Sequence, residues 1–166
     1  MNLQPTLANE IITIKPIQKE DFEALFAIAS DELLWEQHPN KDRYKKEVFQ
    51  LFFENAIQSK GAFIVINNKT NEIIGSSRYY EFNEVEKSIV IGYTFISRAF
   101  WGKNYNSSLK ELMINYAFQF VNKVYFHVGE TNYRSQKAVE KLGAIKIGEI
   151  KSENLSKINW VYQLKK

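Results

Sequence analysis

The sequence predicts an α+β fold, in which a sheet and several helices share a hydrophobic core. The apolar periodicity changes along the chain between alternation, typical of strands, and three-to-four-residue spacing, typical of amphipathic helices. A hydrophobic fraction of 45% with a charged fraction of 25% is enough to bury such a core. The length of 166 residues, without a repeat or a linker, predicts one domain over residues 1–166.

The N-terminal third is expected to contain one strand and two helices. Ile11–Pro16 alternates as a short strand that ends at the proline. Glu20–Ser30 and Arg43–Lys60 have helical spacing, and Gly61 ends the second helix. The side chains expected to face inward from these helices are Phe22, Leu25, Phe26, Ala29, Val48, Leu51 and Phe52.

Three strand patterns follow in the middle of the chain. Ala62–Ile66 is apolar throughout, and Ile73–Phe82 and Lys87–Ile96 come after it. The turn-rich segment Asn67–Asn71 and the polar segment Asn83–Glu86 separate the three. Because these connections are short, we expect an antiparallel meander.

The last third returns to helical spacing and then alternates between the two periods. Tyr105–Phe120 and Asn132–Leu142 are expected to be helices, with a strand at Val124–Val128 between them. Ala144–Ile150 and Ile158–Leu164 are expected to close the chain as strands. The predicted order is therefore β-α-α-β-β-β-α-β-α-β-β.

Composition excludes several classes of site. The absence of cysteine excludes disulfides, thiolate metal sites and a cysteine nucleophile. No apolar run approaches the roughly 20 residues that span a bilayer, and Met1–Glu10 lacks the pattern of a signal peptide, so we expect a cytoplasmic protein. A net charge of +3 does not require a nucleic-acid partner. Residues 131–166 are more basic, with eight Lys and Arg against three acids, which either attracts a phosphorylated ligand or solubilises the surface.

The junction Ile96–Ser108 leads from a strand through a loop into a helix. A helix N-terminus offers unpaired N–H groups and a partial positive charge, which together suit an anion. The same pattern is also that of an ordinary cap on a core helix. Gly102 permits close backbone approach and Lys103 adds a charge. The capping residue types in this junction are Asn104, Asn106, Ser107 and Ser108.

A second junction, Gly129–Gly143, contains a short helix with a serine on its apolar side. Asn132 is a candidate N-cap and Gly143 a candidate C-terminal stop. Ser135 shares a stripe with Val139 and other apolar residues, so its hydroxyl is expected to point inward. A buried hydroxyl needs a partner, which is either the helix backbone or a ligand.

Together the two junctions resemble the GNAT N-acetyltransferase superfamily, and most closely the branch that contains the ribosomal-protein N-terminal acetyltransferases. The motif-level resemblance covers about Ile91–Gly148, while the order of elements resembles the family throughout. Its motifs are Ile91-Gly92-Tyr93, Gly102-Lys103 with Tyr105, Asn132-x-x-Ser135, and Glu140-Lys141-Leu142-Gly143.

The resemblance implies a three-layer fold with a mixed, mostly antiparallel sheet of about six or seven strands and helices on both faces. The fourth and fifth strands, Lys87–Ile96 and Val124–Val128, would splay apart and hold the pantetheine arm of acetyl-CoA. Ser135 would be the catalytic residue, near the thioester sulfur. The residues implied to bind acetyl-CoA are Phe95, Ile96, Trp101, Gly102, Lys103, Asn104, Tyr105, Asn106, Ser107, Asn132, Arg134 and Ser135.

The chain departs from the family pattern in the pyrophosphate loop and at the proton donor. The family loop reads Gln/Arg-x-x-Gly-x-Gly/Ala, whereas the defining positions here hold Trp101, Asn104 and Asn106. Asparagine tolerates left-handed backbone better than most residues, so we expect the cradle to be kept. A tyrosine that protonates the leaving thiolate in many members would fall near Val139, which favours Ser135 for that role.

The general base is the least determined part of the expected site. Transfer to an amine benefits from a base, because amines are largely protonated at neutral pH. The family glutamate that precedes Ile-Gly-Tyr is replaced by Val90. His127 is either a base or a polar residue on a strand face, and His38 lies where the family places a loop that covers the substrate. The candidates are Glu81, Glu84, Glu86, His127 and His38.

The sequence thus predicts direct acetyl transfer from acetyl-CoA to a primary amine, with no metal. The acceptor is left open between a protein N-terminus, an amino sugar or polyamine, and an antibiotic. A catalytically silent acyl-CoA-binding or sensing module is the alternative on the same fold. The low net charge disfavours a small RNA-binding domain. We expect a monomer or homodimer without a nucleic-acid or membrane partner.

Overall fold

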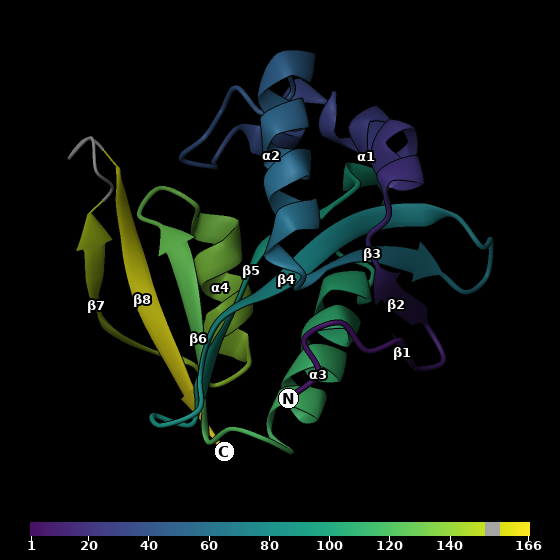
Figure 1. Cartoon of the computed structure of the whole chain (residues 1–166). Helices are drawn as coiled ribbons and strands as arrows, with labels where there is room; N and C mark the ends of the chain where they lie inside the picture. The colour runs from purple at the N-terminus through teal and green to yellow at the C-terminus, as the bar shows by residue number, and fades with distance from the viewer. Residues whose placement is uncertain (152–156) are drawn as a thin grey trace.

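The computed structural model describes residues 1–151 and 157–166, which form a twisted sheet with helices on both faces (Figure 1). None of the described helices is both long enough and apolar enough to cross a membrane. The α-helices are α1 (Phe22–Ala29), α2 (Lys46–Ser59), α3 (Tyr105–Ala117) and α4 (Tyr133–Lys141), and the short 3-10 helices are η1 (Lys19–Asp21), η2 (Glu32–Trp35) and η3 (Arg98–Phe100). The strands are β1 (Leu7–Ala8), β2 (Ile12–Pro16), β3 (Ala62–Asn67), β4 (Ile73–Asn83), β5 (Ser88–Ile96), β6 (Lys123–Gly129), β7 (Ile145–Lys151) and β8 (Ile158–Lys165).

The predicted α+β class and the predicted order of helices and strands are confirmed. The sheet of the described residues has eight strands instead of about six or seven, in the order β1-β2-β3-β4-β5-β6-β8-β7. The strand that the sequence missed is β1, in which Leu7 pairs with Ile14 and Ala8 with Thr13. Two residues are too few to show an alternating pattern, so only the pairing itself defines this strand.

All neighbouring strands are antiparallel except β5 and β6, which are parallel and separate early. Their pairing runs only from Ser88 with Lys123 to Val90 with Tyr125. Beyond Val90, β5 pairs with β4 alone and β6 with β8 alone. The predicted splay is therefore confirmed, and it opens toward the C-terminal ends of both strands (Figure 1).

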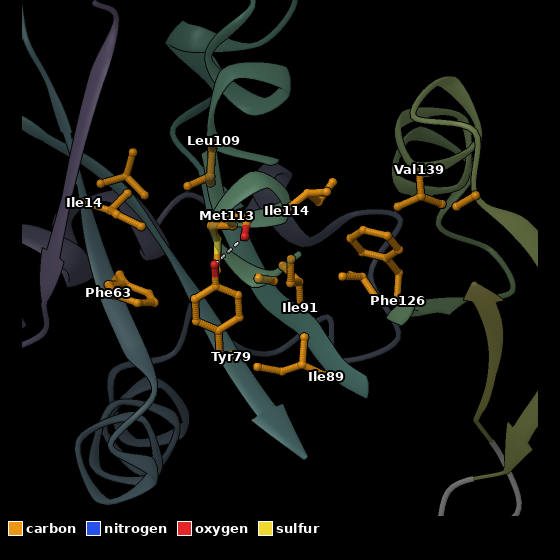
Figure 2. Packing of buried hydrophobic residues seen from close by; sticks show 14 of the residues in the cluster. Ile14, Phe63, Tyr79, Ile89, Ile91, Leu109, Met113, Ile114, Phe126 and Val139 are labelled. Carbon is orange, nitrogen blue, oxygen red and sulfur yellow. Dashed lines mark hydrogen bonds between the residues drawn. The ribbon is translucent and has the colours of Figure 1, made fainter. Parts of the chain in front are cut away.

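Two hydrophobic clusters hold the helices on opposite faces of the sheet (Figure 1). The cluster under α3 and α4 includes Ile89 and Ile91 of β5, which lie near Met113 of α3 (Figure 2). In the same view, the Tyr79 hydroxyl of β4 donates a hydrogen bond to the backbone carbonyl of Met113. The other cluster joins α1 and α2 to the opposite face and includes Phe95 of β5. Residues along β5 therefore reach both helical layers.

The inward face of α2 differs from the prediction, whereas that of α1 agrees with it. Phe22, Leu25, Phe26 and Ala29 of α1 all belong to the second cluster. On α2, Leu51 is 64% exposed, so its predicted burial is wrong. Phe52 is half-buried and packs against the second cluster, as Phe22 and Phe26 do, so its predicted inward orientation is confirmed. Val48 is half-buried and does not belong to that cluster. The sequence carries two overlapping apolar stripes, and packing against α1 and the sheet selects the one formed by Phe49, Phe53 and Ala56.

Candidate active site

Strand β5 bends at the point where it leaves β6. Ser76 of β4 pairs with Phe95 and Arg78 with Gly92, so β5 contains one residue more than β4 across this stretch. This is a β-bulge, and its residue Tyr93 has a left-handed φ of 52°. A bulky residue rarely adopts this backbone, and such strain is concentrated at functional sites. The bulge leaves the β6-facing edge of β5 without a strand partner.

The loop before α3 presents an open helix N-terminus. Gly102 and Asn104 adopt left-handed φ angles of 71° and 66°. Asparagine therefore takes the backbone conformation expected of it. The N-cap residue of α3, Asn104, makes no side-chain capping bond within the described structure, and the Ser107 hydroxyl donates to the Asn104 carbonyl. The first N–H groups of α3, including that of Asn106, have no partner inside the helix. A hollow of about 450 Å³ lies beside Asn104 and Ser107.

Trp101 and Arg134 bring the two predicted junctions together. The Trp101 indole Nε1 donates to the Ile96 carbonyl at 2.9 Å. The Arg134 guanidinium carbon lies 3.6 Å from the centre of the Trp101 ring, a cation–π contact between the loop and α4. The Arg134 backbone N–H in turn donates to Gln37 Oε1 at 3.1 Å. The segment after η2 thus also contacts the start of α4.

The start of α4 carries both an expected contact and a residue that the sequence analysis missed. Asn132 caps the helix and accepts from the Ser135 N–H at 3.5 Å. Ser135 is half-buried, and its hydroxyl makes no hydrogen bond to any described residue, so the bond to the helix backbone, one of the two partners considered for it, is absent here. Gln136 is the buried neighbour, and its side chain donates to the Gly129 and Glu130 carbonyls at 3.0 and 2.9 Å.

Lys110 of α3 is a second residue that the sequence analysis missed. Its ammonium donates to Thr94 Oγ1 of β5 at 2.6 Å and lies 5.6 Å from the Phe126 ring of β6. It therefore spans the two splayed strands. Burial lowers the pKa of Lys110 from 10.5 to about 7. A signal was present, since Lys110 precedes the buried Met113 and Ile114 by three and four residues, which places it beside the apolar stripe.

On the other face of the splay, His127 of β6 lies against Tyr80 of β4. The His127 Nδ1 atom is 3.2 Å from the Tyr80 hydroxyl, and His127 lies beyond the last pair of β5 with β6. Burial lowers the pKa of His127, partly offset by the charge of Glu81, so the imidazole is neutral near pH 7. A Cβ on Gly92 would lie 3.0 Å from the Tyr80 ring, which explains the glycine of the Ile-Gly-Tyr motif.

The other candidate bases lie in positions less suited to a base at the opening between β5 and β6 than that of His127. Glu84 and Glu86 lie in the turn before β5, at the end where β5 and β6 are still paired. Glu86 also forms an ion pair with Lys123 at 3.5 Å. Glu81 is exposed on β4. His38 accepts from the Asn40 N–H through Nδ1, and burial, with the charges of Arg43 and Lys157, lowers its pKa to about 3.

A pocket of about 540 Å³ opens on the face of the sheet that carries α2. Its lining includes three basic side chains from distant segments, namely Arg43 before α2, Arg78 of β4 and Lys157 before β8. Phe52 and Tyr93 supply aromatic surface. Tyr93 also lies 5.0 Å from Tyr80, measured between ring centres, so the pocket adjoins the His127 side of the splay. The sequence analysis did not single out either arginine.

The chain matches a family model described as "Acetyltransferase (GNAT) domain" over residues 12–145, and it belongs to that family. An acetyltransferase of this family from Bacillus anthracis is similar in structure, with a TM-score of 0.80, 19% identity and coverage of 97% of this chain and 98% of that one. A GCN5-related N-acetyltransferase from Brucella melitensis has a TM-score of 0.82 at 16% identity, covering 98% and 79%. Spermidine N-acetyltransferase from Vibrio cholerae, in complex with CoA and spermine, has a TM-score of 0.73 at 16% identity, covering 95% and 96%.

The family model establishes the superfamily and the solved structures share its fold, and the predicted ribosomal-protein branch is not confirmed by them. GNAT acetyltransferases use acetyl-CoA, so acetyl-CoA is the ligand that the geometry of this site has to fit. The described residues contain no group of three or more His, Asp or Glu side chains that could hold a metal ion.

Proposed function

We propose that residues 1–166 act as one domain that transfers an acetyl group from acetyl-CoA to a primary amine, by direct attack in a ternary complex. The observation that best supports this proposal is that β5 separates from β6. The uncapped N-terminus of α3 lies on one side of this opening, and an aromatic, basic pocket lies on the opposite side. The two ligands would thus approach one opening from opposite faces of the sheet.

The residues around α3 and α4 fit acetyl-CoA. The free edge of β5 at Phe95 and Ile96 offers backbone groups to the pantetheine amides, although the Ile96 carbonyl already accepts from Trp101. The left-handed residues Gly102 and Asn104 leave the first N–H groups of α3 open to a pyrophosphate. The further side chains that we assign to acetyl-CoA are Lys103, Tyr105, Asn106, Ser107, Asn132, Arg134 and Ser135.

Acetyl-CoA supplies the acetyl group as a thioester, and the protein must remove a proton from the amine and return one to the leaving sulfur. We assign the first role to neutral His127, directly or through Tyr80 or water, because it lies at the splay on the pocket side. We assign the return of a proton to the leaving sulfur to Ser135, because this residue is half-buried and its hydroxyl forms no hydrogen bond with a described residue. Lys110 is a further proton donor in the same cleft, with a pKa near the working pH.

A catalytically silent acyl-CoA-binding module is the second candidate, and one observation favours it. Val90 is buried at the position of the family glutamate, so no carboxylate faces the splay from that site. The two candidates share the acetyl-CoA site and differ only in turnover.

Two measurements test the proposal. Calorimetry with acetyl-CoA tests the site, and no binding at high micromolar concentration would reject both candidates. A thiol-release assay then compares amines of the acceptor classes, including peptides with ribosomal-protein N-termini, amino sugars and polyamines. Turnover with any of them, abolished when the amine is blocked, supports the enzyme. Binding without turnover would support the silent module instead.

A further inference from the structure

The pocket next to Tyr93 contains a buried arginine that has no anionic partner among the residues the structure describes. Arg78 is 6% exposed, and its Nε atom is buried with no hydrogen-bond partner among the described residues. Its guanidinium carbon lies 4.1 Å from the centre of the Tyr93 ring and 5.6 Å from that of Phe52. A buried guanidinium is normally paired with a carboxylate or with backbone acceptors. Aromatic faces stabilise its charge, but they accept none of its in-plane N–H groups in hydrogen bonds.

Arg43 is a second cation in the same pocket, and its one possible side-chain acceptor among the described residues is a histidine nitrogen. Its guanidinium carbon lies 4.5 Å from the centre of the Phe52 ring. Its Nη1 atom lies 3.4 Å from His38 Nε2. Because His38 Nδ1 accepts from the Asn40 N–H, the proton of the neutral ring is on Nε2, which then cannot accept from Arg43. Arg43 therefore has no acceptor at that position.

The pocket as a whole has an excess of positive charge. Neither arginine forms an ion pair with any residue that the structure describes. Burial lowers the pKa of Arg43 to about 10; repulsion from Arg78 adds to this effect, and the charges of Tyr93 and Asp42 partly offset it. Lys157 also lines the pocket, where its ammonium donates to Asn40 Oδ1, and among the described residues of the lining the exposed Asp42 is the single acidic one. Two buried guanidinium groups so close together repel each other, and an anion bound between them would offset this repulsion.

The pocket is also well placed relative to the expected chemistry. Tyr93 is held at the bulge of β5 with φ of 52°, which is where β5 leaves β6. The Tyr93 ring contacts Tyr80, and the Tyr80 hydroxyl contacts His127. A molecule bound to the arginines would therefore extend past Tyr93 toward the splay.

We propose that the amine acceptor carries an anionic group, a carboxylate or a phosphate, and that Arg43 and Arg78 bind this group. The inference rests on the proposed acetyltransferase function and names the acceptor class. Arginine suits such a group because its planar donors match two oxygens of a carboxylate or phosphate. Polycationic acceptors are disfavoured by the same charges, so we expect the acceptor to differ from the spermine bound by the Vibrio cholerae relative.

The first test compares acceptors that differ only in charge, on the wild-type protein. Free amino acids are assayed by thiol release against their C-terminal amides, with an aminoalkyl phosphate and spermidine as further arms. The amide has the more acidic and therefore more reactive amine, so a preference for the free acid cannot arise from intrinsic reactivity. We expect kcat/KM to be at least about tenfold higher for the anionic acceptors, since a charged hydrogen bond contributes on the order of tenfold or more. The carboxylate and phosphate arms show which anion is preferred. Equal or faster reaction of the amides or spermidine would overturn the inference and leave the acetyltransferase intact.

The second test removes the charges. Arg78→Met and Arg43→Met should each raise KM for the anionic acceptor by about 10- to 100-fold and leave KM for the amide nearly unchanged. Arg78→Lys should bring KM for the anionic acceptor part of the way back to the wild-type value. Lys41→Met is the matched control, because Lys41 is an exposed cation of the same segment and does not line the pocket. If KM rose equally for the free amino acid and for its amide, the arginines would have a structural role only, and the proposal would be refuted.

A third measurement covers the case in which no amine is acetylated. The proposed function then fails, whereas the anion site is judged by calorimetry of the amino acids, their amides and the aminoalkyl phosphate with the wild-type protein. Binding of the anionic compounds, with the amides at least tenfold weaker, would support the site. Absence of binding at millimolar concentration would overturn it. This measurement needs no variant, so it also holds if Arg78→Met does not fold.

Discussion

Replacing Lys110 by methionine should stabilise the ligand-free protein, most strongly at low pH. The side chain lies buried between α3, β5 and β6, and the Thr94 hydroxyl is its hydrogen-bond partner. Burial lowers the pKa of Lys110 from 10.5 to about 7. At about 1.4 kcal/mol for each unit of pKa difference, the lowered pKa corresponds to a destabilisation of the folded protein by at most about 5 kcal/mol at pH 6. Methionine has similar length and no charge, so it removes this penalty.

The sign of the pH dependence follows from proton linkage. Below pH 7 the amine is protonated in the folded and unfolded chains alike, so the full penalty is present. Between pH 7 and 10.5 the unfolded chain binds a proton that the folded chain does not, and the stability of the wild type rises with pH. By pH 9 about 3 kcal/mol of the penalty is recovered. Subtracting about 2 to 3 kcal/mol for the lost hydrogen bond to Thr94, we expect Lys110→Met to gain about 2 kcal/mol at pH 6 and close to nothing at pH 9.

Urea unfolding at the two pH values measures this difference directly. The m-value should stay constant, so that the midpoint reports stability. Lys137→Met is the control, because Lys137 is an exposed lysine on α4, and its effect should be within about 0.5 kcal/mol at both pH values. A destabilised Lys110→Met at pH 6, or a gain that does not change with pH, would show that Lys110 is not held in the cleft as a buried amine.

Three further predictions concern the site. Ser135→Ala should lower kcat more than it weakens CoA binding, as seen by thiol release and calorimetry, and equal losses would make Ser135 a binding residue. His127→Gln should lower kcat/KM by about 100-fold. It should also abolish the fall of kcat/KM at acidic pH, which we expect below pH 6.5 because burial lowers the pKa of His127. A pH profile of kcat/KM that is unchanged in this variant would exclude His127 as the base. Asn104→Gly should keep acetyl-CoA affinity within about twofold, whereas Asn104→Val should destabilise the chain by about 1 to 2 kcal/mol in urea unfolding, since Asn104 has a φ of 66°. Equal stability of the two Asn104 variants would contradict the left-handed assignment.

Local signals were enough for the four α-helices, for every strand except β1, and for the backbone of the loops before α3 and α4. Asn104 was expected to tolerate left-handed backbone and adopts it, and Asn132 was expected to cap a helix and does so. Each of these features depends on residues that are neighbours in the chain, which is the range over which propensity and periodicity act. Ser135 shows the limit of such reasoning, because a helical stripe gives a direction and not the depth of burial, and Gln136 occupies the buried position.

The sequence by itself therefore determined the fold class, the order of elements and the splay expected from the family resemblance. Only the tertiary structure decided which stripe of α2 is buried, that Lys110 lies between the splayed strands, and that Arg43 and Arg78 share one pocket. The two arginines are distant in the chain and come from different elements, so no periodicity connects them. Their meeting depends on Phe52 of α2, because both guanidinium groups lie against its ring, and long-range packing of this kind decides where charge accumulates.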